Sequence, residues 1–409
     1  MSIRLSSAVP GLITYLYPLE ETEKEKYFMY KCILLLATTL ILFSCGGSGS
    51  KFVVTGSVLD SEGVGIPDVT VTMGGFKTTT DISGKYSFSD ISEGSYTITP
   101  SLQGAVFSPN SITLYIALDT STGTSFSVFW RPAKSASSSN LLGISYLNNT
   151  YFATGAAGTI LLSQDGRTWS TGSTGTSNTI NDLYGVAFGN GKYVAVGAGG
   201  TVLVSTDGLT WSVLSSITNA DIFDILFDST IGTFVAVGTG GSVLVSSDGL
   251  TWTVVTQIIT AAINKIASFN GTLYAVGSGG AIITSNDGMT WTMLTSGTTS
   301  DLYGIFFGNN SYIAVGSGGT VLTSANGTAW FSMSIGVSNM LTGVAFGGTN
   351  FVATGTGFGN VFISPDGSTW TPKITDGSTN PPRMNRIIYG NGAFVAVGDN
   401  GTIYWTSMP

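Results

Sequence analysis

The sequence predicts an all-β chain, a small β-sandwich followed by a seven-bladed β-propeller, from three observations. Only 9% of the 409 residues are charged, 56 are Gly and 43% are hydrophobic, a composition typical of short strands and tight turns. Apolar and polar residues alternate with period two across residues 52–127, as in a sandwich of antiparallel strands. A stretch of about forty residues then recurs as far as the C-terminus, which is the spacing of propeller blades.

Composition also excludes several classes of function. The formal net charge of -8 argues against a nucleic-acid partner, which needs a basic face to offset phosphate charge. The chain has no His, so a His-based triad or a His metal site is excluded. Its two Cys, Cys32 and Cys45, both lie near the N-terminus, which leaves no disulfide framework or thiolate zinc site in the body of the chain. We therefore expect no cofactor and no metal.

Residues 29–45, MYKCILLLATTLILFSC, have the features of an export signal. Lys31 precedes an apolar run that is too short to span a bilayer. The polar, Glu-rich stretch before it does not belong to such a signal, so we expect Met29 to be the true initiator. Residues 1–44 are then an upstream segment and signal peptide, and residues 45–51, with GGSGS at 46–50, form a flexible tether.

The end of this signal, Leu42-Phe43-Ser44-Cys45, resembles the lipobox of bacterial lipoproteins. The resemblance implies that Cys45 is acylated and becomes the new N-terminus, and multiple acyl chains give stable anchoring. The alternative is an ordinary signal anchor with an incidental Cys. The protein is then expected to be exported and lipid-anchored to the cell envelope, at the outer membrane or the cell surface.

Residues 52–127 read TGSVLDSEGVGIPDVTV, TTTDISGKYSF and GSYTITP in succession, with turn residues between the apolar runs. The Asp81–Gly84 turn lets Tyr86 and Phe88 enter the next strand. This sequence pattern resembles the carboxypeptidase-regulatory-like (prealbumin-like) domain, whose bacterial relatives act as spacers. We expect a spacer with no chemistry of its own.

The propeller is predicted for residues 128–409 from recurring Trp residues at 169, 211, 252, 291, 330 and 370, which are 42, 41, 39, 39 and 40 positions apart. Each unit reads as strand, Gly/Asn turn, strand, Gly-rich hairpin, strand, Asp-Gly turn and a last strand that opens with the Trp. The Gly-Gly pairs supply the positive φ of the hairpins.

The Asp-Gly turns resemble the Asp-box of the sialidase-type (BNR) repeat, Ser-x-Asp-Gly-x-Thr-Trp. A structural role is favoured, because an Asp can accept backbone N–H groups across its own turn. Calcium binding is disfavoured, because one carboxylate per turn makes a poor cation cage. The fifth unit has Asn326 in place of the acid. The Asp residues at this position are Asp165, Asp207, Asp248, Asp287 and Asp366.

The seventh unit, residues 383–409, ends before an Asp-Gly turn or a fourth strand. An open blade would expose an unpaired strand edge. Trp130 lies ten residues before Asn140, the same offset as Trp211 before Asp221. We therefore expect about residues 127–133 to supply the missing outer strand. The alternative is that residues 125–130, SFSVFW, form only the last strand of the sandwich.

A ligand site is expected on the loops that lead into the inner strands. Four units share a Gly there (Gly143, Gly185, Gly304 and Gly343), and three carry a charge instead. This is the position where the repeats diverge chemically, although a neighbouring ion pair and ordinary aromatic packing would explain it too. The candidate ligand-binding residues are Tyr184, Phe223, Asp224, Lys265, Tyr303, Arg383 and Arg386.

Catalysis is not expected. Sialidases of the resembling family use an Arg triad, a Tyr/Glu pair and an acidic proton donor, whereas no Glu follows Glu93 here. The alternative function is a glycoside hydrolase with paired carboxylates on the same loops. Its candidates are Asp182, Asp221, Asp224 and Asp301.

The phrase VAVGxGGTVLxSxDGxTW also resembles the photosystem II stability/assembly factor-like propellers. Those factors carry an Arg-rich patch for membrane-protein partners, and this chain shows no obvious equivalent, so the photosynthetic role is not carried over. We expect a monomeric, exported, lipid-anchored envelope protein that binds a protein or a glycan without catalysis. A third alternative is a structural envelope component with no specific ligand.

Overall fold

The computed structural model describes residues 51–60, 63–103, 105–116, 124–171, 179–333, 335–357, 361–373 and 382–407. Residues 51–409 form one compact unit. The expected start at Met29, the lipid site Cys45 and residues 45–50 of the tether lie outside the described residues. In the described ranges no helix is long and apolar enough to span a membrane. Their elements are β-strands and three-residue 3-10 turns, so the all-β prediction is confirmed.

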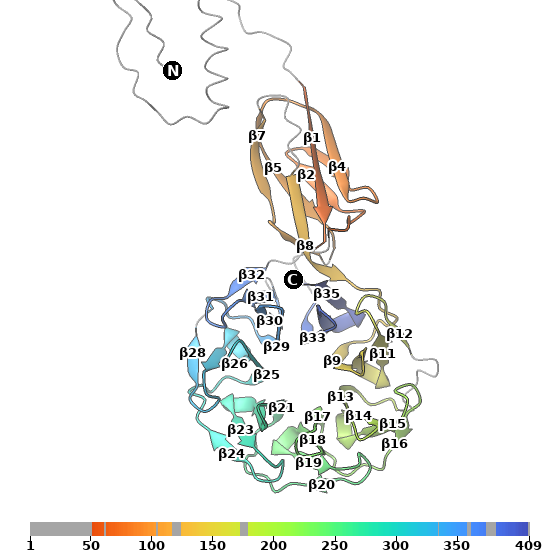
Figure 1. Ribbon diagram of the computed structural model, residues 1–409, viewed down its shortest axis with the longest axis vertical. Helices are drawn as coiled ribbons and strands as arrows, with labels where there is room; N and C mark the ends of the chain where they lie inside the picture. Colours follow the sequence, from red (N-terminus) through yellow and green to blue (C-terminus); the bar gives the residue numbers. More distant parts are fainter. Residues whose placement is uncertain are drawn as a thin grey trace, which may run out of the picture. The chain divides into compact units, whose positions relative to one another are not determined.

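The N-terminal part is a sandwich of two sheets (Figure 1). In the first sheet β1 pairs with β4 antiparallel and with β8 parallel, and β6 pairs with β8. The second sheet is antiparallel, in the order β3-β2-β5-β7. The strands are β1 (Phe52–Leu59), β2 (Thr70–Met73), β3 (Phe76–Thr79), β4 (Lys85–Ile91), β5 (Gly94–Ser101), β6 (Val106–Ser108), β7 (Ile112–Ile116) and β8 (Thr124–Pro132).

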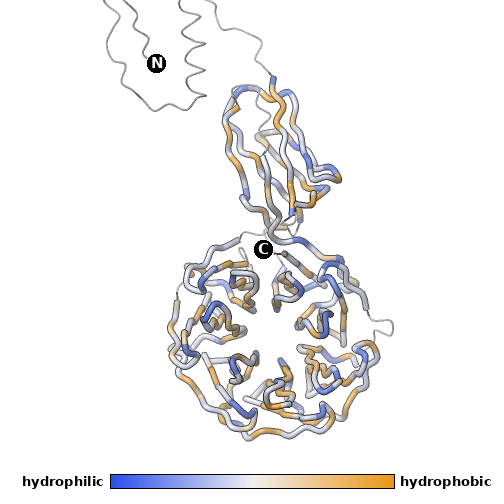
Figure 2. Tube along the Cα trace, in the orientation of Figure 1, coloured by the Kyte–Doolittle hydropathy of each residue, from blue (hydrophilic) through white to orange (hydrophobic). Residues whose placement is uncertain are grey.

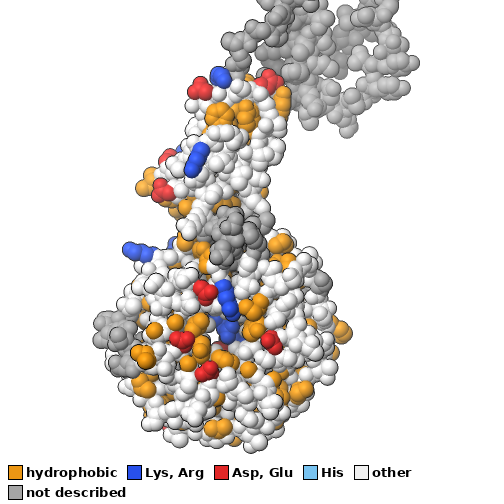
Figure 3. Space-filling model, turned by 180° about the vertical axis from the view of Figure 1, so that it is seen from behind, with side chains coloured by type: hydrophobic (Ala, Val, Ile, Leu, Met, Phe, Trp, Pro, Cys, Tyr) orange, Lys and Arg blue, Asp and Glu red, His pale blue; other side chains and the backbone are white. Residues whose placement is uncertain are grey.

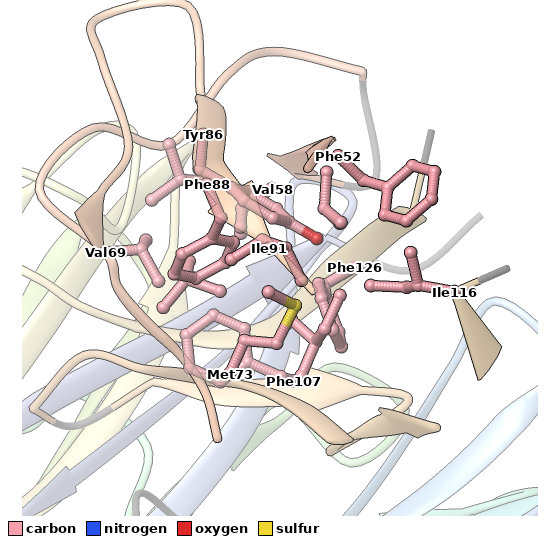
Figure 4. Close-up of a cluster of buried hydrophobic side chains, with 14 of the residues drawn as sticks. Phe52, Val58, Val69, Met73, Tyr86, Phe88, Ile91, Phe107, Ile116 and Phe126 are labelled. Carbon is pink, nitrogen blue, oxygen red and sulfur yellow. The ribbon is translucent and has the colours of Figure 1, made fainter. Parts of the chain in front are cut away.

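Period-two alternation fills the core between these sheets. Along β4 the exposed Lys85 and Ser87 alternate with the buried Tyr86 and Phe88, because successive strand residues point to opposite faces. Asp81 closes the preceding turn by accepting N–H groups of Ser83 and Lys85 at 2.8 and 2.9 Å. Figure 4 shows the side chains converging from both sheets, including Phe52, Met73, Phe107 and Phe126.

The C-terminal part contains six sheets of four antiparallel strands, arranged around a ring in Figure 1. A propeller-like set of sheets is therefore observed. The six sheets are β9 (Leu141–Leu147), β10 (Thr150–Gly155), β11 (Ile160–Ser163), β12 (Ser170–Thr171); β13 (Leu183–Gly189), β14 (Lys192–Gly197), β15 (Val202–Ser205), β16 (Ser212–Val213); β17 (Ile222–Asp228), β18 (Thr233–Gly238), β19 (Val243–Ser246), β20 (Thr253–Val254); β21 (Ile263–Phe269), β22 (Thr272–Gly277), β23 (Ile282–Ser285), β24 (Thr292–Leu294); β25 (Leu302–Gly308), β26 (Ser311–Gly316), β27 (Val321–Ser324), β28 (Phe331–Met333); β29 (Leu341–Gly347), β30 (Asn350–Gly355), β31 (Val361–Ser364) and β32 (Thr371–Lys373).

Burial explains why the sheets pack face to face. The second strand of each sheet is buried over five consecutive residues, as in β14, whereas the outer strands β16 and β20 are exposed. Clusters such as Val194, Val204, Ile225 and Phe234 fill the space between neighbouring sheets. Hydrophobic residues accordingly run around the whole ring in Figure 2. Strands buried on both faces carry continuous apolar runs rather than alternation.

A further sheet contains β33 (Met384–Gly390), β34 (Ala393–Gly398) and β35 (Ile403–Ser407), and it lies between the last and first of the six. Its inner strand β33 contacts both β29 and β9, so the inner strands follow one another without a break.

Strand β8 belongs to the sandwich and to the ring at once. It pairs with β1 in the sandwich and with β35 in the ring, where Arg131 faces Trp405 and Pro132 faces Tyr404. The amide of Ala133 donates to the carbonyl of Ile403 at 2.8 Å. The paired residues lie within the 127–133 stretch from which the sequence predicts an outer strand, and β8 runs across the boundary expected between residues 127 and 128.

Candidate functional site

The loops that lead into the inner strands lie on the same side of the ring as the hairpin turns between second and third strands. We call this side the loop face. Side-chain oxygens before three inner strands accept an amide N–H from the turn of the preceding sheet. The pairs are Asp182 with Ala157 at 3.0 Å, Asp221 with Gly199 at 2.8 Å and Asp301 with Gly279 at 2.8 Å.

Asn140 makes the same bond across the junction of the last and first sheets, accepting from the amide of Asn400 at 2.9 Å. Each donor has a positive φ at the tip of its 3-10 turn, between 52° and 65°. Such turns leave an outward amide without a partner in its own hairpin, and the neighbouring side chain satisfies it. These four side chains therefore join neighbouring sheets. The turns are η1 (Ala156–Gly158), η2 (Ala198–Gly200), η3 (Thr239–Gly241), η4 (Ser278–Gly280), η5 (Ser317–Gly319) and η6 (Asp399–Gly401).

Three charged residues on inner strands meet at the centre of the ring. Lys265 Nζ lies 2.9 Å from Asp224 Oδ2, which also accepts the Ile266 amide at 2.9 Å. From β33, on another part of the ring, Arg386 Nη2 reaches the carbonyl of Asn264 on β21 at 3.1 Å. Arg386 Nη1 donates to the Thr342 carbonyl at 3.3 Å. The Arg386 side chain thus crosses the centre.

The aligned position of these three charged residues is Gly in the other four sheets. Asp224, Lys265 and Arg386 occupy the position that is Gly143, Gly185, Gly304 and Gly343 in the other sheets. A Cβ on Gly143 would lie 2.2 Å from the Tyr184 carbonyl oxygen, so the neighbouring backbones approach closely. Burial lowers the pKa of Arg386, the Asp224 carboxylate opposes this shift, and Arg383 adds to it.

In several sheets the residue before this position links its inner strand to the next one. Asn264 Nδ2 donates to the Leu302 carbonyl at 2.9 Å, and Asn385 Nδ2 donates to the Leu141 carbonyl at 2.8 Å. Tyr184 and Phe223 instead pack edge to face, with ring centroids 5.5 Å apart. Burial is the main cause that raises the pKa of Tyr184, with the carboxylates of Asp221 and Asp182 adding to the rise.

The candidate residues therefore fall into two groups. The structure brings Asp224, Lys265 and Arg386 together, and exposed Arg383 is near enough to Arg386 to affect its pKa. Tyr184 and Phe223 contact each other, and Tyr303 donates to Asp301 Oδ2 at 3.3 Å. Figure 3 shows basic side chains at the centre of one face of the ring, with acidic side chains around them.

Sequence reasoning missed three contributors to this centre. Asn264 and Asn385 stand in the same aligned position, and each bonds to the next inner strand. Asp399 replaces the small first residue of the hairpin turn, and its Oδ1 accepts from Asn385 Nδ2 at 3.0 Å. The signal available in the sequence was that polar residues replace Leu, Tyr and Phe at that position.

The Asp-Gly turns bind their own backbone. Asp287 Oδ1 accepts the amides of Met289 and Thr290 at 2.8 and 2.7 Å and the Ser285 hydroxyl at 3.0 Å. Asp165, Asp207, Asp248 and Asp366 accept the amides two and three residues ahead in the same way. Asn326 does so without a charge, at 3.0 and 2.9 Å. The described residues contain no cluster of three or more acidic, His or Cys side chains that could hold a metal ion.

These bonds predict acid sensitivity. The amides of Thr290 and then Met289 lower the pKa of Asp287 to about 2, from an ordinary 3.8. A lowered folded-state pKa means that the stabilisation is complete above about pH 4 and is lost as the pH falls through about 2. We expect Asp287→Asn to melt near wild type at neutral pH, as Asn326 suggests, and to lose less on acidification. Thermal melts of both proteins at neutral pH and near pH 2 measure this difference.

The matched variant Asp287→Ala should melt below both at neutral pH, because the two amides lose their acceptor. Equal acid sensitivity of Asp287→Asn and wild type would contradict the assignment of the pH dependence to this turn.

The carboxylates proposed for the hydrolase alternative are all engaged. Asp182, Asp221 and Asp301 each accept a neighbouring turn amide, and Asp224 is buried against Lys265. The geometry offers this alternative no specific support.

The fold and these contacts define a β-propeller with a charged centre on its loop face. Residues 216–339 match the family described as "DUF6242 beta propeller domain". Among curated proteins no sequence matches this chain.

Several solved structures are similar to it. YCF48 from Cyanidioschyzon merolae is 19% identical with a TM-score of 0.56, over 68% of this chain and 99% of its own. A structure described as YCF48 bound to D1 peptide is 19% identical with a TM-score of 0.57, over 68% and 95%. Virginiamycin B lyase from Staphylococcus aureus is 12% identical with a TM-score of 0.59, over 68% and 99%. At these identities the likeness shows the propeller fold alone.

Proposed function

We propose that this chain is an exported, lipid-anchored envelope protein whose propeller binds a protein segment on its loop face and catalyses no reaction. Cys45 is the proposed lipid site, and mass analysis of the mature N-terminus tests it directly. We count seven blades, taking β33, β34, β35 and β8 as the last, and we assign the Asp-Gly turns as Asp-boxes. The sandwich is assigned as a prealbumin-like spacer.

One observation carries the binding proposal. The centre of the loop face is bridged by Arg386, which is held by backbone carbonyls from β21, β29 and β33. A charged centre held by carbonyls from three inner strands is preorganised, and preorganisation lowers the cost of binding. Arg383 is exposed beside it. The exposed Arg383 therefore lies beside a fixed, buried basic group, and Asp182, Asp221 and Asp301 stand on the same loop face.

A protein ligand fits this surface better than a glycan. At the centre the described aromatic rings Tyr184 and Phe223 pack on each other, and Tyr303 bonds to Asp301, so they are not arranged as open stacking platforms. The similar propeller described as bound to a peptide makes a protein partner consistent with the fold. Binding sites on such scaffolds are formed by loops that a rigid core holds in place.

The test compares peptide and glycan arrays probed with the full chain and with Arg383→Glu. We expect peptides to be retained, and Arg383→Glu to weaken their binding by about tenfold or more, which corresponds to one charged contact. Lys192→Glu is the matched control, because Lys192 follows the Asn190-Gly191 turn on the opposite face, where Asn190 bonds to Ser247. Glycan retention alone, or turnover of a polysaccharide, would overturn the proposal.

A further inference from the structure

Exposed apolar side chains gather along the outer edge of three neighbouring sheets. The outer strands of these sheets are β16, β20 and β24, and Figure 1 shows them on the side of the ring away from β35. Val213, Val254 and Met293 stand two positions after the Trp that precedes each strand, and they are 49%, 57% and 65% exposed. We call these three residues, with the exposed Leu250 and Met289 of the turns before β20 and β24, the apolar rim.

The sheets on either side of the apolar rim are polar at the same repeat positions. Two positions after the Trp, β12 has Thr171 and β28 has Ser332, both exposed, while the exposed Phe331 of β28 stands one position earlier. In the turns before these strands, Arg167 and Thr328 take the place of the apolar residue. The repeat therefore folds without apolar groups there. Exposed apolar side chains that gather in one place mark an interaction surface.

The strands and turns of the apolar rim contain carboxylates and no Lys or Arg. Asp207, Asp248 and Asp287 begin the three turns, and backbone amides of each turn lower the pKa of all three to about 2, so they are ionised at neutral pH. Between positions 193 and 372 the sequence has one basic residue, Lys265, whose ion pair lies at the centre of the ring. A complementary partner therefore combines apolar and basic side chains.

A hollow of about 230 Å³ at one of these turns fits a basic side chain. It is lined by Asp287 together with hydroxyl side chains and one side-chain amide. The lining includes Thr290 and Thr292, and Thr292 directly precedes Met293 in the chain. Carboxylate and hydroxyl oxygens accept hydrogen bonds from an ammonium or a guanidinium group. A basic group of the partner thus finds acceptors next to an apolar contact.

Charge also distinguishes among the surfaces that could cover the apolar rim. Three ionised carboxylates repel an anionic membrane surface. The rim of a second copy would bring further carboxylates against them, and like charges across an interface are unfavourable. A basic amphipathic helix, in contrast, places its apolar face on the rim while Lys and Arg at the margin of that face meet the carboxylates.

We propose that the apolar rim binds a basic amphipathic helix of a partner protein. Val254 and Met293 contact the apolar face of the helix, and Asp207, Asp248 and Asp287 pair with its basic residues. The rim is a different surface from the loop face, so this inference goes beyond the function proposed above and does not depend on it.

The probe is a labelled synthetic helix of Leu and Lys, about 18 residues or about five turns long, with Leu on one face. It is titrated against the full chain by fluorescence anisotropy. We expect it to bind about tenfold or more tightly than a peptide of the same residues in scrambled order. A helix of Leu and Glu with the same pattern should not bind. Equal binding of the scrambled peptide would overturn the proposal, because charge alone would then explain it.

The apolar contacts are tested by Val254→Asn combined with Met293→Asn, which should weaken binding of the Leu/Lys helix by about tenfold or more. The matched control is Thr171→Asn with Ser332→Asn, at the same position of β12 and β28, and it should bind as wild type. All four side chains are exposed, so each variant should fold as wild type. An equal loss in both pairs would show that the rim is not the site.

The charges are tested by Asp248→Asn combined with Asp287→Asn. These substitutions keep the turns, because Asn326 accepts the same two amides in its own turn. We expect binding weakened by about tenfold and less dependent on salt. Asp165→Asn with Asp366→Asn is the matched control in the first and sixth sheets, and it should bind as wild type. Unchanged binding in the first pair would contradict a basic partner.

The same variants identify a different occupant if there is one. A concentration-dependent dimer in sedimentation that is lost with Val254→Asn and Met293→Asn would assign the rim to a second copy and overturn the proposal. Retention on phosphatidylcholine vesicles that is lost in this variant would assign it to a membrane surface. Arg383→Glu should leave binding of the Leu/Lys helix unchanged. A loss with Arg383→Glu, and none with the rim variants, would place the helix on the loop face.

Discussion

Trp405→Ala is expected to lower the free energy of unfolding by about 3–5 kcal/mol, the usual cost of removing a large buried aromatic side chain. Trp405 is 5% exposed and packs between the last and first sheets of the ring with Tyr151, Trp169 and Val395. The guanidinium carbons of Arg131 and Arg167 lie 4.7 and 4.1 Å from its ring centroid. Both cation–π contacts would be lost with the ring.

This prediction is measured by chemical unfolding followed by circular dichroism. The matched control is Thr323→Ala, at the equivalent position of β27, where the side chain is half-buried and no ring closure depends on it. We expect a loss below about 1 kcal/mol there. A similarly small loss for Trp405→Ala would mean that the last sheet joins the first without this side chain.

The second large effect is expected at the contact between sandwich and ring. Arg131 on β8 forms an ion pair with Asp60, which is 8% exposed and also accepts the Val64 amide at 2.7 Å. Burial, and then the nearby Arg167, lower the pKa of Arg131 to about 10, so it stays charged at neutral pH. Asp60→Ala leaves that charge without its carboxylate, which costs about 3 kcal/mol for a mostly buried pair.

Thermal and chemical unfolding of Asp60→Ala test this estimate. Glu93→Ala is the control: Glu93 is an exposed carboxylate of the sandwich that accepts the Tyr115 hydroxyl at 3.0 Å, and this variant should change stability by less than about 1 kcal/mol. The double variant Asp60→Ala with Arg131→Leu should recover part of the loss, because the unpaired charge is gone. Additive losses in the double variant would contradict a direct pairing of these two groups.

Because β8 pairs with strands of both the sandwich and the ring, the two parts are joined by more than a linker. The segment after β8 also pairs with the first Asp-Gly turn, since the Lys134 amide donates to the Arg167 carbonyl at 2.9 Å and the Lys134 carbonyl accepts from Trp169 at 3.0 Å. Residues 131–134 therefore contact the sandwich, the last sheet and the first sheet. A sandwich joined in this way takes part in the contact between the last and first sheets of the ring and is not an independent module.

The candidate site was predictable only in part. Divergence at one aligned position pointed to Asp224, Lys265 and Arg386, and the structure places these three together. It did not reveal that Asp182, Asp221 and Asp301 are bound to turn amides of the preceding sheet, because that bond needs the positive φ of a residue some twenty positions away. The different junction at Ala262 was not predicted, since the lack of a carboxylate there has meaning only once the links at the other junctions are known.

By itself the sequence determined the strands, the hairpins and the Asp-Gly turns. These depend on residues close in the chain: Asp287 needs only Ser285, Met289 and Thr290. The tertiary structure decided which sheets meet, that β8 serves two of them, and that Arg386 crosses to a carbonyl 122 residues away. Local hydrogen bonding fixes the first set, whereas the second follows from closing the ring, which brings distant residues together.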